Sequence, residues 1–234
     1  DAAERLYADA LGALCTMQTA DNAMVRELPR YTHALLMREM ELMPEWFLHR
    51  HLGVQISSAE RGMLDRLFET LAQSALTQPA AFVHRDYHSR NLLVTADNNP
   101  GILDFQDAVW GPVTYDLVSL LKDCYVAWPA ARVSAWALQY RERLLAGGFA
   151  SSLTKAEFIH GFDLVGLQRH IKVLGIFARL HYRDGKVQYL KDLPRVLRYT
   201  RDAAAAYAET AEFAEFIADR VDPEFLAAQS RALA

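Results

Sequence analysis

Cysteine is scarce in this chain: its 234 residues contain two, Cys15 and Cys124, far apart on apolar helical segments. This spacing excludes a disulfide framework, and we expect both residues to be reduced core thiols of a cytoplasmic protein. The sequence shows no signal peptide, no apolar run of transmembrane length, no internal repeat and no low-complexity segment. The net charge of −4 gives no indication of a nucleic acid or membrane partner.

What the chain does contain is apolar residues, at 52%, mostly in helical periodicity. This content is enough for a core in one domain. Two capping boxes, Ser57-x-x-Glu60 and Thr154-x-x-Glu157, predict helix starts. The predicted helices cover residues 3–18, 31–43, 57–78, 114–128, 129–145, 154–183 and 188–221, with an interruption at 222–223.

The segment from Phe82 to Leu117 differs from the helical remainder. A short apolar strand at 81–83 is followed by a polar loop at 84–91, a second apolar run at 92–94, a turn at 96–101 and a third apolar run at 102–103. Two short strands joined by a turn rich in Gly, Pro and Asn predict a β-hairpin. Because its arms are similar in length, we expect Asn91 and Asp104 to lie side by side, with Asp86 in the same loop.

These three side chains suggest a chemistry. Mg²⁺ prefers oxygen ligands, of which the protein commonly supplies one or two, and Asn91 and Asp104 provide them. Asp86 then remains available to accept a proton from a substrate hydroxyl during phosphoryl transfer. The alternative is a polar hairpin with accidental Asp and Asn residues, but the ordered set of polar residues at strand ends favours a site.

The catalytic loop of the kinase superfamily resembles residues 84–91, HRDYHSRN, and its metal-binding segment resembles LDF at 103–105. The pattern His-x-Asp-x-His-x-x-Asn is similar to the aminoglycoside phosphotransferase family, as is the later segment LDFQDA…GPVTYDL. This chain has Trp110-Gly111-Pro112 where that family usually has Gly-Asp-Pro. Within the family, the amino-acid sequences of these segments and of QRHIKVLGIFARL most closely resemble those of the anomeric N-acetylmuramate and N-acetylglucosamine kinases of bacterial cell-wall recycling.

The resemblance implies roles for further residues near the loop. His84 supports the loop through backbone hydrogen bonding, and Asp116, in the first turn of a helix, braces it from beneath. His88 either contacts substrate or braces Asp86. Arg85 either meets a phosphate or substrate or lies on the surface, and Asp107 either reaches the surroundings of the metal or stabilises a turn.

The helix predicted at 154–183 carries a basic stripe that includes Arg169 and Lys172 and that we interpret mainly as a solvated face. The alternative is that an arginine such as Arg169 meets a substrate carboxylate, which N-acetylmuramate has on its lactyl arm. His170 lies among apolar residues, as a buried hydrogen-bonded histidine or as a substrate contact. Glu39, on an earlier helix, is expected to be solvated.

Lysine is absent before Lys122, and no glycine-rich loop precedes His84. Kinase-like enzymes place such a loop and a lysine in a smaller lobe that precedes the catalytic loop. We therefore expect residues 1–234 to form the larger C-terminal lobe, with the catalytic loop at 84–91 and the metal segment at 102–107. The N-terminal ATP-clamping lobe is expected to be missing, and the isolated lobe to be inactive.

The fold expected from these patterns is α+β and predominantly helical: the C-terminal lobe of a protein-kinase-like fold with a small β-hairpin at the active site. The function expected is ATP- and Mg²⁺-dependent phosphorylation of an amino sugar, with a small-molecule sugar and a nucleotide as partners. Phosphorylation of an aminoglycoside or another small alcohol is the second hypothesis. A non-catalytic pseudokinase lobe is the third.

Overall fold

The computed structural model describes residues 2–20, 25, 27–149 and 152–232. The chain divides into two compact units, each built from two stretches of sequence: residues 1–32 with 74–165, and residues 33–73 with 166–234. The long helix α7 (Lys155–Asp184) begins in the first unit and continues in the second. In the described part of the chain, no helix combines the length and the apolar character that crossing a membrane requires.

The first unit contains all the strands found among the described residues, in two small antiparallel sheets. One sheet pairs β1 (Ala80–Val83) with β4 (Val109–Pro112), and the other pairs β2 (Leu92–Leu93) with β3 (Gly101–Ile102). The helices of this unit are α1 (Ala2–Thr19), α5 (Tyr115–Leu121), α6 (Ala130–Ala146) and the start of α7. The predicted class, α+β and predominantly helical with a small hairpin, is confirmed.

The sheet of β1 and β4 leads the chain into the polar loop at residue 84. Phe82 pairs with Trp110, and Val83 pairs with Val109. A short bridge from residues 29–31 extends this sheet, since the Tyr31 N–H donates to the Trp110 carbonyl at 2.9 Å. A Cβ at Gly111 would lie 2.9 Å from the Tyr31 Cβ, so only glycine allows this close approach. The sequence patterns predicted β1 but not β4.

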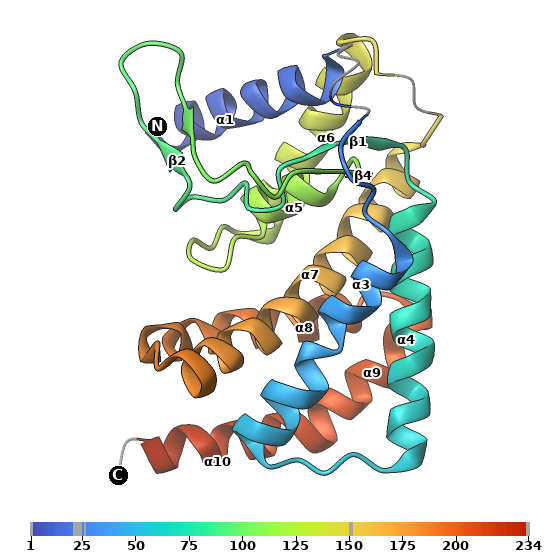
Figure 1. Cartoon of the computed structure of the whole chain (residues 1–234). Helices are drawn as coiled ribbons and strands as arrows, with labels where there is room; N and C mark the ends of the chain where they lie inside the picture. Colours follow the sequence, from blue (N-terminus) through green and yellow to red (C-terminus); the bar gives the residue numbers. More distant parts are fainter. Residues whose placement is uncertain (1, 21–24, 26, 150–151, 233–234) are drawn as a thin grey trace. The chain divides into compact units, whose positions relative to one another are not determined.

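The predicted hairpin of β2 and β3 forms, with Leu92 opposite Ile102 and Leu93 opposite Gly101, a register in which Asn91 faces Leu103 rather than Asp104. Its tip is tied to α1, because the Asn99 amide donates to the Asp9 carboxylate at 2.8 Å. Figure 1 shows the hairpin beside the first turns of α1.

The buried amide of Gln18 links α1 to the sheet that precedes the loop. Its Nε2 donates to the carbonyls of Phe82 at 3.1 Å and Val113 at 3.2 Å, and its Oε1 accepts from the Tyr140 hydroxyl at 2.7 Å. Burying a polar group is costly unless it is hydrogen-bonded, and here the amide is satisfied by three residues distant in the sequence. It therefore fixes α1 and α6 around the strand that carries the loop.

The helix predicted at 114–128 is shorter than expected: α5 ends at Leu121. The side chain of Asp123 takes up the backbone N–H of Tyr125 at 2.7 Å. Aspartate side chains compete with the helical hydrogen-bond ladder in this way and end helices. The chain then runs without regular structure to Pro129, after which α6 starts as predicted.

The second unit is built from helical segments packed together. Its elements are α3 (His33–Met40), the π-helical η1 (Met43–Leu52), most of α4 (Ser58–Leu76), the rest of α7, η2 (Val187–Asp192), α8 (Leu193–Ala204), η3 (Ala208–Thr210), α9 (Ala211–Phe216), η4 (Ile217–Val221) and α10 (Asp222–Ala232). Both predicted capping boxes form: Ser57 with Glu60 at the start of α4, and Thr154 with Glu157 at the start of α7.

The interpretation of the basic stripe as a solvated face was wrong for Lys172, and so was that of Glu39. Lys172 Nζ lies 3.0 Å from Glu39 Oε1, and both side chains are only 8% exposed. Arg169 is buried as well, at 5% exposure. The central part of α7 is therefore enclosed, and the charge of Lys172 is accommodated in the interior because it meets the carboxylate of Glu39 there.

The C-terminal region differs from the prediction in two places. The alanine-rich segment at 203–217 is not one helix, because α8 ends at Ala204 and the Thr210 hydroxyl donates to the freed Ala204 carbonyl at 2.7 Å. Asp222 and Pro223 do not interrupt a helix; they open α10, where a proline in the first turn costs no hydrogen bond. Side-chain packing thus overrides helix propensity here.

Candidate active site

Residues 84–91 form a compact loop between β1 and β2. The His88 N–H donates to the Asp86 carbonyl at 3.0 Å, and the Asn91 N–H donates to the His88 carbonyl at 2.9 Å. The side-chain Nδ2 of Asn91 closes the loop by donating to the same Asp86 carbonyl at 3.0 Å. Because its nitrogen is used in this way, the oxygen is the atom of the Asn91 amide that is suited to binding a metal.

The hairpin brings Asp104 to the end of this loop. The Leu103 N–H donates to the Asn91 carbonyl at 3.0 Å, one step beyond the strand pair of Leu92 and Ile102. Asp104 therefore follows directly after the residue that faces Asn91. Its carboxylate is exposed, and Oδ1 accepts a hydrogen bond from Gln106 at 2.9 Å. Asp86, Asn91 and Asp104 thus belong to one connected loop and hairpin, in which Asp104 lies one residue beyond the position expected opposite Asn91.

Two residues of this region have left-handed backbone conformations that side chains other than glycine rarely adopt. Arg85, directly before Asp86, has φ of 75°, and Asp104 has φ of 68°. Such positions cost on the order of 1–3 kcal/mol and concentrate at functional sites, where surrounding contacts hold them. The strain falls on the two segments that carry the candidate carboxylates.

His84 is fully buried beneath the loop, and its Nδ1 accepts a hydrogen bond from the Asp86 N–H at 3.3 Å. Burial lowers the pKa of His84, and the negative charges of Asp86 and Asp104 partly oppose this effect. Both carboxylates therefore lie within electrostatic range of the same imidazole. A neutral ring is required at Nδ1, since only the unprotonated nitrogen accepts a hydrogen bond.

Asp116, the buried acid in the first turn of α5, holds the start of the loop. Its two carboxylate oxygens accept hydrogen bonds from the backbone N–H groups of His84 at 2.6 Å and Arg85 at 3.0 Å. Hydrogen bonds to an ionised carboxylate are short and strong. These bonds stabilise the left-handed conformation at Arg85 and so help to fix the backbone position of the next residue, Asp86.

Sequence patterns missed a second buried acid, Asp123, which holds the other half of the loop. Its Oδ2 accepts from the Ser89 N–H at 2.9 Å, while Oδ1 accepts from the Tyr125 N–H. Tyr125 in turn contacts two loop side chains: the ring of His88, edge to face, and the guanidinium of Arg90. No local signal identifies Asp123, because its partner Ser89 lies 34 residues away in the sequence.

The other predicted substrate contacts are more dispersed. The Arg85 guanidinium lies 5.9 Å from the ring centre of the buried Tyr31, and Asp107 occupies a turn closed by the Ala108 N–H and the Phe105 carbonyl. Arg169 and His170 belong to the second unit. His170 is buried, and its ring stacks on that of Tyr199 at 5.0 Å. The structure thus unites the loop residues, whereas the roles of these four remain predictions.

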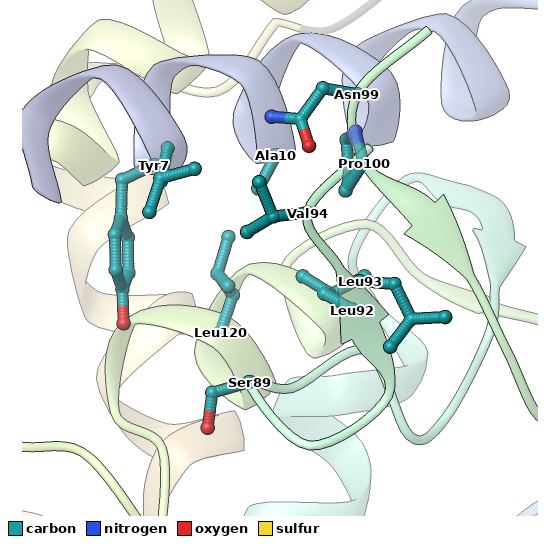
Figure 2. A pocket seen from close by; sticks show the side chains of 10 residues that line it. Tyr7, Ala10, Ser89, Leu92, Leu93, Val94, Asn99, Pro100 and Leu120 are labelled. Carbon is teal, nitrogen blue, oxygen red and sulfur yellow. The ribbon is translucent and has the colours of Figure 1, made fainter. Parts of the chain in front are cut away.

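The hairpin that connects Asn91 to Asp104 carries exposed apolar side chains along its arms and at its end. Leu93 and Leu103 are about half exposed, and Val94 and Phe105 are more exposed, at 73% and 67%. Next to them, a cavity of about 160 Å³ is lined mainly by apolar side chains of α1, α5 and the hairpin. In Figure 2, Leu92 and Val94 face Ala10 and Tyr7 across this cavity, with Ser89 at its lower end.

The residues present fit a magnesium ion. Asn91 and Asp104 offer an amide oxygen and a carboxylate, which are hard oxygen ligands, and Mg²⁺ usually takes one or two of these from the protein and the rest from phosphates and water. Among the described residues, no cluster of three or more His, Cys, Asp or Glu side chains forms a denser metal site. Asp86 is a carboxylate on the same loop that is suited to accepting a proton.

Comparison with known proteins shows the family to which the chain belongs. A family model described as "Phosphotransferase enzyme family" matches residues 1–153. The N-acetylmuramate/N-acetylglucosamine kinases of Pseudomonas putida and Pseudomonas aeruginosa are each 46% identical to this chain, over 94% and 92% of its length. The kinase of the same name from Neisseria meningitidis is 41% identical over 94%. The chain spans 63–65% of the length of these three relatives.

Among solved structures, the ADP-bound aminoglycoside phosphotransferase APH(2'')-Ib matches with a TM-score of 0.48 and 13% identity, over 85% of this chain and 64% of that one.

Proposed function

The chain belongs to the phosphotransferase enzyme family, and we propose that it is the catalytic part of an ATP-dependent kinase that phosphorylates an amino sugar. The observation that carries this proposal is the joining of Asp86, Asn91 and Asp104 in one loop and hairpin, through the hydrogen bonds of Asn91 to Asp86 and Leu103. These are the residue types that phosphoryl transfer needs: a base for the hydroxyl and oxygen ligands for a metal.

In the proposed reaction, Asp86 orients the acceptor hydroxyl and takes its proton as the hydroxyl oxygen bonds to the γ-phosphorus of ATP. The bond between that phosphorus and the bridging oxygen breaks, and ADP leaves. Asn91 and Asp104 would hold Mg²⁺, which would supply neutralisation of phosphate charge. Asp116 and Asp123 hold the loop so that these groups are in place before substrate arrives.

The exposed side chains of Leu93, Val94, Leu103 and Phe105 offer a surface for the flat adenine base next to the metal residues. The lysine and glycine-rich loop that usually clamp the phosphates have no counterpart before His84. More than a third of the length of the relatives lies outside the match, and we infer that the missing clamp lies there. A cytoplasmic location fits this proposal, since ATP is the donor and both cysteines are free thiols.

The substrate class follows from the relatives, whose printed names are N-acetylmuramate/N-acetylglucosamine kinase. The resemblance of the motifs favours the anomeric hydroxyl as the acceptor. The alternative acceptors, aminoglycosides, are polycations that require a pocket lined with carboxylates. The loop at residues 84–91, by contrast, carries the basic residues Arg85, His88 and Arg90 and Asp86 as its one carboxylate.

The decisive experiment is a substrate panel on the full-length gene product. It compares N-acetylmuramate, N-acetylglucosamine and kanamycin-type compounds with Mg²⁺ and ATP, and phosphorus NMR identifies the phosphorylated position. We expect phosphorylation of the N-acetyl sugars at the anomeric oxygen. Turnover of the aminoglycosides alone would support the second hypothesis instead. Failure to bind Mg²⁺ and nucleotide, measured by calorimetry, would support a non-catalytic lobe.

A further inference from the structure

One aromatic ring, that of Tyr125, contacts two side chains of the loop at residues 84–91. The guanidinium of Arg90 lies over the face of Tyr125 at 3.5 Å from the ring centre. The imidazole of His88 meets the same ring at 5.3 Å, with the two planes at 81° to each other. Arg90 is exposed, whereas Tyr125 and His88 are partly buried. The ring therefore supports a positively charged group at the surface of the loop.

Asp123 fixes this ring and the loop with a single carboxylate. One oxygen accepts from the Tyr125 N–H at 2.7 Å and the other from the Ser89 N–H at 2.9 Å. Asp123 is 1% exposed, so these bonds form away from water, where they are strongest. The position of Arg90 relative to the loop is consequently set by buried contacts rather than by a flexible side chain alone.

We propose that Arg90, positioned by Tyr125 and Asp123, binds a carboxylate of the acceptor sugar and favours acidic over neutral N-acetyl sugars. This inference rests on the proposed function, because it assigns a recognition residue to the same site. Stacking occupies a flat face of the guanidinium, and the N–H groups of any guanidinium lie in its plane, in an arrangement that matches the two oxygens of a carboxylate. Prepositioning on the ring lowers the entropy lost on binding.

The place of Arg90 in the loop supports this role. It follows Asp86 by four residues and directly precedes Asn91, in a loop closed by the bonds from His88 and Asn91. The other arginine of the loop, Arg85, is turned towards the buried Tyr31. N-acetylmuramate carries a carboxylate on its lactyl arm, and N-acetylglucosamine lacks it. The two substrates therefore differ in the group that Arg90 would recognise.

The test measures kcat/KM for both sugars with the full-length protein and its Arg90→Gln variant. We expect the ratio of N-acetylmuramate to N-acetylglucosamine to fall by about 10- to 100-fold, which is the usual effect of losing a hydrogen-bonded charge pair. The change should lie mainly in the KM for N-acetylmuramate. Tyr125→Leu, which removes the ring, should lower the same ratio. Tyr125→Phe, which keeps the ring, should leave the ratio at the value of the unchanged protein.

A matched control is Arg50→Gln, since Arg50 is also exposed and stacked on an aromatic ring, that of Trp46 at 4.7 Å, but lies in the second unit. Its ratio should stay within about twofold of the unchanged protein. An equal loss on both sugars in Arg90→Gln would overturn the inference and leave the proposed function standing. If the unchanged protein phosphorylates neither sugar, the proposed function is wrong and the inference falls with it.

Discussion

The backbone carbonyl of Asn91 accepts a hydrogen bond from the N–H of Leu103 at 3.0 Å, and this bond joins the opposite arms of a hairpin. This bond continues the strand register by one step and places Asp104 next to the end of the loop at residues 84–91. A slip of the register by one residue would turn Asp104 to the opposite face of the hairpin. The candidate metal site therefore depends on a pairing only two residues long.

Replacement of the candidate metal ligand Asp104 should weaken magnesium binding. Asp104→Asn keeps the shape of the side chain but removes its charge, so the Mg²⁺ concentration for half-maximal turnover should rise roughly tenfold or more. Calorimetric titration of Mg²⁺ and nucleotide provides a readout that is independent of turnover. Asp97→Asn, at an exposed position of the same hairpin, is the control and should leave both quantities unchanged. An unaltered Mg²⁺ requirement in Asp104→Asn would exclude Asp104 as a ligand.

Replacement of the candidate base should affect turnover rather than binding. Asp86→Asn removes the proton acceptor and leaves the hydrogen bonds to the Asp86 backbone in place. In the complete protein we expect kcat to fall by about 10²- to 10⁴-fold, with nucleotide affinity nearly intact. Steady-state kinetics and a nucleotide titration separate the two effects. Retention of turnover would show that another group accepts the proton.

The buried His84 should make stability depend on pH. Burial lowers its pKa below the ordinary value of 6.5, so the unfolded chain binds more protons than the folded protein in this range. Its contribution to stability is complete above about pH 6.5 and is lost as the pH falls from there towards the lowered folded-state pKa. Protonation also removes Nδ1 as acceptor for the Asp86 N–H.

The measurement for His84 is the melting temperature of the unchanged protein and of His84→Gln across this pH range. We expect the unchanged protein to lose stability more steeply on acidification than the variant. Identical slopes would mean that His84 does not titrate differently in the folded and unfolded states. An NMR titration of the His84 ring gives the folded-state pKa directly.

Replacing one member of the buried pair of Lys172 and Glu39 should destabilise the protein strongly. Replacing both members by apolar residues should destabilise it much less. Lys172→Met leaves the Glu39 carboxylate buried beside an apolar side chain, which we expect to cost about 3–5 kcal/mol in the free energy of unfolding. Glu39→Leu with Lys172→Met removes both charges and should recover most of this loss. Urea denaturation measures both variants.

The exposed pair of Arg66 and Glu212, whose side chains are 65% and 64% exposed, is the control for Lys172. Arg66→Met should change the free energy of unfolding by no more than about 1 kcal/mol. A double variant as unstable as Lys172→Met alone would mean that the pair contributes through its packing and other contacts rather than through charge.

Several parts of the molecule could be predicted from short stretches of sequence because the contacts that define them are local. The capping boxes of Ser57 with Glu60 and Thr154 with Glu157 join residues three apart, and both form. The hairpin between Asn91 and Asp104 follows from two apolar runs and a turn. The residue types of the candidate site were likewise readable in order along the chain.

The sequence by itself determined the helical character, the hairpin and the identity of the loop residues, since hydrogen bonds between near neighbours and the apolar periodicity fix these. Only the tertiary structure decided which polar groups are buried together. Asp123 holds Ser89 across 34 residues, and Lys172 meets Glu39 across 133. Such pairs leave no local pattern, because they are selected by the desolvation of charges in a packed interior rather than by the backbone that carries them.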